Sequence, residues 1–425
     1  PSEIGVFSAS LEGLFMGDNT LIGTIPIELG RLRLLNMLSL ENNRLSGSIP
    51  FQLGNSRRLQ ELNLYNNLLT GQIPTVLLKH QSLLELNIAS NALVGIPRTG
   101  LDNDDNDNDY PCTAFPDPFN RLANRLIGNA KFGFFPQKTK YLQKNAPPLK
   151  TLSLSNNLIE GTIPTTLAYF AYLVELNLAS NSFTGNIPSE LGHLGELAIL
   201  DFHDNLVTGT IPTEIGEGRS LKILNFYNNS LGANIPSEIG NCFKLKELIL
   251  DKNKFTGAIP SSFGNLIALE YLSLSGNSMS GILPSEIGQL RKIKNLDIRD
   301  YVIGSSGTEP DSTIPSEYGL LKDWKYVVFR NNKLTGTLPS TLGQLNATEV
   351  IWIVNETLRG SIPSEIADMS NLKTISLNDN EMEGTIPSTI GRAPALTFVN
   401  LGGNKLTGTI PPEQGDIENL TALIL

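Results

Sequence analysis

Hydrophobic and polar positions recur along this chain with a period of 24 residues. The segments LSLENNRLSGSIP (38–50), LNLYNNLLTGQIP (62–74) and LNLASNSFTGNIP (176–188) align to the consensus LxxLxLxxNxLxGxIPxxLGxLxx. The alternation in LxL predicts a short strand with one buried face. A single unit cannot bury its own leucines, so successive units are expected to stack with their strands in parallel.

One asparagine in each unit marks the register of the repeat, at the point where the chain turns away from the predicted sheet. Its amide can satisfy buried backbone groups that an apolar residue would leave unpaired, at a cost of ~1–3 kcal/mol each. Tyr301 and Glu356 occupy two further positions of the series, which makes fifteen clear units, and a sixteenth begins at Leu420. The predicted asparagine ladder consists of Asn19, Asn43, Asn67, Asn91, Asn157, Asn181, Asn205, Asn229, Asn253, Asn277, Asn332, Asn380 and Asn404.

The second half of the unit carries Gly-x-Ile/Leu-Pro, as in GTIP at 23–26, GNIP at 185–188 and GTLP at 336–339. Gly tolerates a turn, and Pro fixes an extended, non-helical exit. The LxxLxLxxNxL pattern with this period is a leucine-rich repeat. With GxIP, the chain resembles the plant-type extracellular leucine-rich repeat family of receptor-like kinase and receptor-like protein ectodomains and polygalacturonase-inhibiting proteins.

The resemblance implies an α/β repeat solenoid: a right-handed superhelix with a parallel concave sheet and a second small strand in the GxIP segment. It also implies an extracellular or cell-surface recognition protein, without catalysis and without a cofactor. The sequence departs from the family at its ends, PSEIG and LTALIL, which lie inside units and carry no cysteine-paired cap. We therefore expect both caps to be absent.

The repeat is interrupted between Asn91 and Asn157, which are 66 residues apart. The sequence predicts one block of four repeats (1–97), an island (98–148), and a second block of eleven repeats (149–425) with a further insertion at 304–313. NRLIG at 124–128 and GFFP at 133–136 match parts of the consensus, so the island is expected to contain one degenerate repeat around Asn124.

The island begins with an acidic run, LDNDDNDNDYPC at 101–112. Alternating carboxylates could bind calcium through oxygen ligands, but the run lacks the Gly and terminal Glu of an EF-hand loop. A solvated or internally paired acidic loop is the favoured interpretation, with no metal bound. The carboxylates concerned are Asp102, Asp104, Asp105, Asp107 and Asp109.

Net charge, apolar runs, cysteines and glycosylation sequons each limit what kind of protein this is. The formal net charge of −10 argues against nucleic acid and anionic membranes, which select for basic patches. No apolar run approaches the ~18 residues of a membrane helix. The two cysteines, Cys112 and Cys242, exclude a disulfide framework, and no bond between them is expected. Sequons for N-glycosylation occur at Asn228, Asn346, Asn355 and Asn419.

No catalytic motif is present in the sequence. The segment LDFHDN places Asp201 and His203 on one strand face, with Tyr227 one unit along. An acid, an imidazole and a phenol on one wall form a second candidate patch. Such a group is usually ordinary polarity of a sheet surface, so it does not argue for an enzyme.

The x positions of LxxLxLxx point to the concave face, because side chains alternate across a strand. Most units carry small or polar residues there, such as Ser39, Asn63 and Asn87. Larger residues gather in the C-terminal half, where aromatic and Arg side chains are typical of interface hot spots. The alternative is that Trp352 merely packs against Tyr326 and Val328. The candidate ligand-binding residues are Tyr271, Arg299, Tyr326, Arg330, Trp352 and Phe398.

Three functions compete on these observations. The first is a recognition module that binds a protein, peptide or glycan, with a co-receptor or a neighbouring assembly subunit as a further partner. The second is a structural segment of a larger extracellular or cell-wall assembly. The third is ice binding, suggested by Thr24, Thr162 and Thr210 in the GxIP row, although Ser, Gln, Asn or Ala breaks that row in other units.

Overall fold

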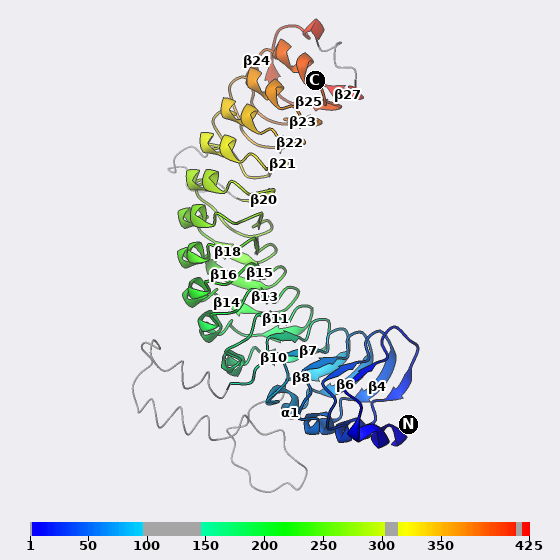
Figure 1. The fold of residues 1–425 in the computed structure, drawn as a ribbon. Helices are drawn as coiled ribbons and strands as arrows, with labels where there is room; N and C mark the ends of the chain where they lie inside the picture. Colours follow the sequence, from blue (N-terminus) through cyan, green and yellow to red (C-terminus); the bar gives the residue numbers. More distant parts are fainter. Residues whose placement is uncertain (1, 97–145, 302–312, 414–418) are drawn as a thin grey trace, which may run out of the picture. The chain divides into compact units, whose positions relative to one another are not determined.

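The computed structural model describes residues 2–96, 146–301, 313–413 and 419–425. The chain divides into two compact units, which are described separately: unit 1 comprises Pro1–Gly185 and Leu194–Leu206, and unit 2 comprises Asn186–His193 and Val207–Leu425. Within each unit, short parallel strands form one wall and 3-10 turns form the opposite wall (Figure 1). Each unit is therefore a solenoid with a long parallel sheet on its concave side and 3-10 turns on its convex side.

Unit 1 is built from repeats that each contribute a concave strand, a lateral strand and an outer turn. The concave strands are β1 (Gly13–Phe15), β3 (Met37–Ser39), β5 (Glu61–Asn63), β7 (Glu85–Asn87), β9 (Thr151–Ser153), β11 (Glu175–Asn177) and β13 (Ile199–Asp201). The lateral strands are β2 (Ile22–Thr24), β4 (Arg44–Ser48), β6 (Leu68–Gln72), β8 (Ala92–Gly95), β10 (Glu160–Thr162) and β12 (Ser182–Thr184). The outer turns are η1 (Ser2–Ala9), η2 (Ile27–Arg31), η3 (Phe51–Asn55), η4 (Thr165–Tyr169) and one short α-helix, α1 (Thr75–Leu78).

Unit 2 repeats the same plan. Its concave strands are β15 (Ile223–Asn225), β17 (Glu247–Ile249), β19 (Tyr271–Ser273), β20 (Asn295–Asp297), β21 (Tyr326–Arg330), β22 (Val350–Val354), β23 (Thr374–Ser376), β25 (Phe398–Asn400) and β27 (Ala422–Ile424). The lateral strands are β14 (Thr208–Gly209), β16 (Ser230–Asn234), β18 (Lys254–Thr256), β24 (Glu383–Gly384) and β26 (Lys405–Leu406). The outer turns are η5 (Ser189–His193), η6 (Thr213–Glu217), η7 (Ser237–Asn241), η8 (Ser261–Asn265), η9 (Ser285–Gln289), η10 (Ser316–Leu320), η11 (Ser340–Gln344), η12 (Ser364–Asp368) and η13 (Ser388–Arg392).

The core of each unit consists of apolar rows that run from repeat to repeat. The central residue of each concave strand pairs in register with its neighbour, as Leu248 does with Leu272 and Leu272 with Leu296. These three leucines are at most 3% exposed. Because burying one such side chain contributes ~1.5–3 kcal/mol, stacking the repeats supplies the stability that no repeat has alone.

The 3-10 turns begin after the proline of GxIP. Pro236 has an extended backbone (φ −63°, ψ 132°), and η7 follows it directly. Ile239 of this turn is buried, and the adjacent Gly240 lies so close to the next turn that a Cβ there would collide with the Ser262 carbonyl oxygen. The IPSEIG sequence therefore encodes an extended exit, a buried anchor and a close contact between turns.

The asparagines of the predicted ladder make hydrogen bonds to the backbone of adjacent repeats. Asn253 is 7% exposed, and its Nδ2 donates to the carbonyl oxygens of Phe226 (2.8 Å), Leu250 (3.2 Å) and Asp251 (3.2 Å). Its Oδ1 accepts the backbone N–H of Leu231 at 3.0 Å. One amide thus satisfies backbone groups of two adjacent repeats, and the same arrangement recurs along both units.

The ladder continues from residues 85–96 to residues 146–157. Strand β7 pairs in parallel with β9, and Leu93 donates its backbone N–H to Asn157 Oδ1 at 3.0 Å. All but the last three residues of the predicted island (98–148), including its degenerate repeat around Asn124 and the acidic run, lie outside the described residues, as does most of the insertion at 304–313.

Two repeats replace the ladder asparagine, and each does so differently. Tyr301 turns its phenol toward the lateral wall, where the hydroxyl donates to the carbonyl of Ser280 (3.1 Å) and accepts the N–H of Ile259 (3.3 Å). Glu356 stays in the ladder, 5% exposed, and its carboxylate accepts the backbone N–H groups of Asn332 (2.9 Å) and Leu334 (2.7 Å). Burial raises the pKa of Glu356 to about 7 despite these two bonds.

Replacing a ladder asparagine tests the contribution of its amide. We expect Asn253→Ala to lower the free energy of unfolding by roughly 2–4 kcal/mol, because buried carbonyl and N–H groups lose their partner. Urea denaturation followed by circular dichroism measures the change. Asn241→Ala, at an exposed position of η7, is the matched control and should leave the midpoint unchanged. Equal effects of the two substitutions would contradict the role assigned to the ladder.

Glu356 makes stability depend on pH. The unfolded chain releases the Glu356 proton near pH 4.5, whereas the folded protein holds it until about pH 7. The contribution of this group is therefore complete below pH 4.5 and is lost as the pH rises through 7. Relative to Glu356→Gln, the wild type should lose up to roughly 3 kcal/mol of unfolding free energy over that interval. Parallel stability-against-pH curves for the two proteins would contradict this.

Candidate ligand-binding surface

The six predicted ligand-binding residues all lie on the concave wall of unit 2. Tyr271 and Phe398 begin β19 and β25, Tyr326 and Arg330 are the two ends of β21, and Trp352 is the centre of β22. Arg299 follows β20 by two residues. Tyr326 is 42% and Trp352 47% exposed. Tyr271 and Phe398 are half-buried.

The centre of this surface is formed by β21 and β22. Val328 pairs with Trp352 and Tyr326 with Val350, so these four side chains occupy adjacent positions of one sheet face. Trp352 pairs on its other side with Ser376, a small residue that leaves the indole open. Packing against Val328 therefore accounts for part of the Trp352 surface, and nearly half of it faces solvent. We refer to Tyr326, Val328, Arg330, Val350 and Trp352 as the aromatic patch.

The two arginines of this region differ in whether the guanidinium group is paired with a carboxylate. Arg299 Nε lies 2.8 Å from Asp297 Oδ1, and its terminal nitrogen also contacts Asp297 Oδ2. This bidentate pair raises the pKa of Arg299 and neutralises it locally. The guanidinium group of Arg330 has no hydrogen-bond or ion-pair partner among the residues described. Arg330 is therefore the cation that the aromatic patch can offer to a ligand.

A charged row that sequence reasoning missed borders the same face. It occupies the position just before each concave strand. Lys294 Nζ lies 2.6 Å from Glu270 Oε2, Lys246 Nζ lies 3.6 Å from Glu270 Oε1, and Lys373 Nζ lies 2.7 Å from Glu349 Oε2. Hydrogen bonds from Lys294 and Lys373 lower the pKa values of Glu270 and Glu349. Lys and Glu alternate at the repeat spacing in this row. That spacing is visible in the sequence and could have predicted the ion pairs.

The second candidate patch is divided between the units. In unit 1, His203 Nδ1 lies 2.7 Å from Asp201 Oδ1, and His203 Nε2 lies 3.9 Å from Asp204 Oδ2. The hydrogen bond with Asp201 raises the pKa of His203 above its usual value. Tyr227 belongs to unit 2, where Lys252 Nζ lies 5.1 Å from its ring centroid. The structure thus brings Asp201 and His203 together and gives Tyr227 a different neighbour.

The four sequons and the described cysteine differ in their exposure to solvent. Asn228, Asn346, Asn355 and Asn419 are all exposed, and their glycosylation stays a prediction. Cys242 is 1% exposed, with its sulfur 3.4 Å from the Ile215 carbonyl oxygen. Burial raises the pKa of the Cys242 thiol to about 11, so this thiol is unreactive at neutral pH.

Neither a metal-binding cluster nor a membrane-spanning helix is found in the part of the chain that the structure describes. No group of three or more His, Cys, Asp or Glu side chains is arranged to hold a metal ion among those residues. No helix within the same residues is long and apolar enough to span a bilayer.

The chain belongs to the leucine-rich repeat family. Leucine-rich repeat models match residues 243–300 and, as single repeats, residues 58–79, 148–170, 172–194, 220–242 and 371–393. No curated protein sequence matches the chain.

Solved structures extend the likeness over nearly the whole chain. A TDR receptor is 25% identical, with a TM-score of 0.77, and the match covers 99% of this chain and 69% of that one. The Arabidopsis receptor kinase HAESA ectodomain, solved with an IDA peptide hormone ligand, is 28% identical with a TM-score of 0.78, covering 99% and 62%. HAESA was also solved with IDA and the co-receptor SERK1; that match has 28% identity and a TM-score of 0.65, covering 100% and 70%.

The likeness is not confined to plants. A leucine-rich repeat protein of Leptospira interrogans is 27% identical, with a TM-score of 0.69, covering 99% of this chain and 90% of that one. This chain thus spans less than two thirds of the HAESA ectodomain solved with its extended peptide, and most of the bacterial protein. It resembles extracellular receptor ectodomains.

The Asp201–His203 pair gives a prediction that is independent of any ligand. We expect Asp201→Asn to lower the pKa of His203, because the strongest partner of the imidazolium becomes neutral. NMR titration of the histidine ring protons measures the change. His80, whose pKa is lowered mainly by burial, is the internal control and should titrate as before. An unchanged His203 titration would show that Asp201 does not control it.

Proposed function

We propose that the protein is a non-enzymatic extracellular recognition module and that the aromatic patch of unit 2 binds an extended peptide or protein segment. The observation that carries the proposal is Trp352, 47% exposed in the middle of a concave strand and bordered by Tyr326 and Arg330. Folding alone does not require a large aromatic side chain there. Most other repeats carry small polar residues at the same position, such as Ser39, Asn63 and Ser376.

The chemistry of the patch indicates what the ligand supplies. Tyr326, Val328, Val350 and Trp352 offer a flat apolar area for one or two apolar side chains, and aromatic side chains of this kind contribute most to binding when they are desolvated at the centre of an interface. Arg330 at the end of β21 can bind a carboxylate or another anionic group. The ligand is therefore expected to combine an apolar side chain with an acidic group.

Two of the six predicted ligand-binding residues, Tyr271 and Phe398, lie on either side of the aromatic patch. Tyr271 is two strands from Tyr326 along the sheet, through Asn295, and Phe398 is two strands from Val350, through Thr374. Adjacent strands are ~4.8 Å apart, so the flanking rings lie on the order of 10 Å from the centre. A peptide of several residues can contact all three groups, whereas a small molecule cannot.

The solved relatives support a peptide ligand. The HAESA ectodomain, with which this chain shares its fold, was solved with a peptide hormone and with a co-receptor. A peptide for this protein and a second protein as co-receptor follow by analogy.

Binding measurements on concave-face variants test the proposal. A display library of secreted peptides and protein domains is selected on the intact chain, and affinities of the selected ligands are then measured. We expect Trp352→Ala to weaken binding about 30-fold, equivalent to ~2 kcal/mol, and Tyr326→Ala to have a smaller effect. Phe15→Ala is the matched control, because Phe15 is 64% exposed on the first concave strand of unit 1.

Two outcomes would argue against the aromatic patch. Equal losses for Phe15→Ala and Trp352→Ala would mean that the ligand does not select unit 2. Selection of no ligand, together with assembly of the free chain into filaments in electron micrographs, would instead support a structural segment of a larger assembly.

A further inference from the structure

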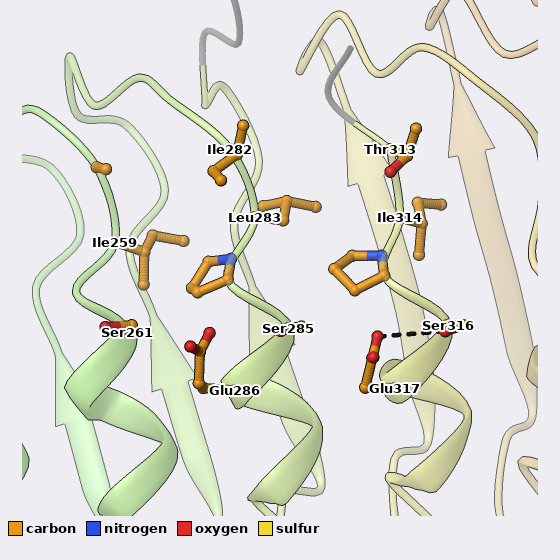
Figure 2. A pocket seen from close by; sticks show the side chains of 13 residues that line it. Ile259, Ser261, Ile282, Leu283, Ser285, Glu286, Thr313, Ile314, Ser316 and Glu317 are labelled. Carbon is orange, nitrogen blue, oxygen red and sulfur yellow. Dashed lines mark hydrogen bonds between the residues drawn. The ribbon is translucent and has the colours of Figure 1, made fainter. Parts of the chain in front are cut away.

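Unit 2 contains a groove on its lateral wall, away from the strands that carry the aromatic patch. Its volume is about 750 Å3, within the usual range of binding clefts. Three consecutive repeats line it with their GxIP segments and the first residues of their outer turns (Figure 2). The lining comprises residues 258, 259 and 261 of the first repeat, 282–286 of the second and 313–317 of the third.

The floor of the groove is apolar. Ile259, Leu283 and Ile314 are each at most 5% exposed and stand side by side in Figure 2. Ile282, in contrast, is 51% exposed at the edge of the groove. Ile282 occupies the x position of GxIP, where the other complete GxIP segments of the two repeat blocks carry Thr, Ser, Gln, Asn or Ala. An exposed Ile at this single position departs from the repeat without any gain for the core.

Two tyrosines hold the floor from inside the repeat. Tyr301, in place of a ladder asparagine, bonds to the backbone of Ile259 and Ser280. Tyr318 is fully buried where other turns have Ile, Leu or Phe, and its hydroxyl lies 3.4 Å from the Pro284 carbonyl oxygen. Departures from the repeat consensus thus coincide under one groove, which indicates a built site and not an incidental gap between turns.

The charge of the groove is acidic. Glu286 and Glu317 project from the first turns of η9 and η10 along one side of the apolar floor (Figure 2). Ser316 Oγ donates to Glu317 at 3.2 Å, whereas Glu286 has no hydrogen-bond or ion-pair partner among the residues described. No Lys or Arg is among the lining residues. Two carboxylates beside an apolar floor complement a chain that alternates cationic and apolar side chains.

We propose that this groove binds an extended basic segment of a partner protein. In an extended chain, side chains two residues apart point to the same side and are ~6.6 Å apart. One set of apolar side chains packs on Ile282 and the floor formed by Ile259, Leu283 and Ile314. Lys or Arg side chains of the same segment pair with Glu286 and Glu317. The groove would thus add a second interaction surface, independent of the ligand of the aromatic patch.

Selection from a random peptide library tests the proposal on the full chain. Phage displaying random twelve-residue peptides are selected on the wild type and, in parallel, on Ile282→Thr and on Glu286→Gln/Glu317→Gln. Ile282→Thr restores the residue that several other units carry, so folding should be unaffected. We expect peptides rich in Lys or Arg and apolar residues to be enriched on the wild type. Their affinity, measured by fluorescence anisotropy, should fall at least tenfold with either variant and weaken with added salt.

Two controls separate this groove from other surfaces. Glu238→Gln changes the equivalent Ser-Glu turn of η7, outside the groove, where Ser237 Oγ donates to Glu238 at 3.2 Å. Trp352→Ala changes the aromatic patch. Neither should alter binding of the selected peptides. The proposal is overturned if no peptide distinguishes the wild type from the groove variants, or if the enriched peptides lose binding with Trp352→Ala. Because the two surfaces have separate variants, failure of one leaves the other testable.

Discussion

The structure depends on a side-chain amide that makes hydrogen bonds to the buried backbone groups of adjacent repeats. A typical ladder asparagine accepts one N–H and donates to carbonyl groups of its own and the preceding repeat, as Asn253 does for Leu231, Phe226 and Leu250. Without this amide, the turn that leaves each concave strand would bury unpaired polar groups. The amide therefore allows the chain to turn into an apolar leucine core in the repeats that carry it.

Because the ladder and the leucine rows supply the stability, the exposed positions are released from folding constraints. The concave position between the two strand leucines can be Ser, Asn, Asp, Val or Trp without changing the path of the chain. The same holds for the x position of GxIP on the lateral wall. Large apolar residues at such positions, Trp352 on one wall and Ile282 on the other, are therefore not required by the fold, and for this reason the two binding proposals rest on them.

Irregular repeats show how the ladder can be modified. Glu356 keeps the accepting role of the asparagine but has no amide to donate, and its burial raises its pKa to about 7. The neighbouring Asn332 Nδ2 is buried with no hydrogen-bond partner. Tyr301 leaves the ladder entirely and supports the lateral wall instead. The charged row beside the concave strands follows a simpler rule: opposite charges stand one repeat apart, and because they are solvated each pair contributes little to stability.

The sequence by itself determined the repeat, its register and the asparagine ladder, because each depends on contacts that recur at a fixed spacing. It also placed Tyr326, Arg330 and Trp352 on the concave wall, since alternation along a strand is a local property. Only the tertiary structure decided which side chains are open: Tyr271 and Phe398 are half-buried, and Arg299 is paired with Asp297 while Arg330 is not. The lateral groove was equally hidden from the sequence, because its floor joins residues from three repeats, and Tyr301 reaches it across positions 42 residues apart. Exposure, pairing and cavities depend on neighbours in space, which a linear pattern does not specify.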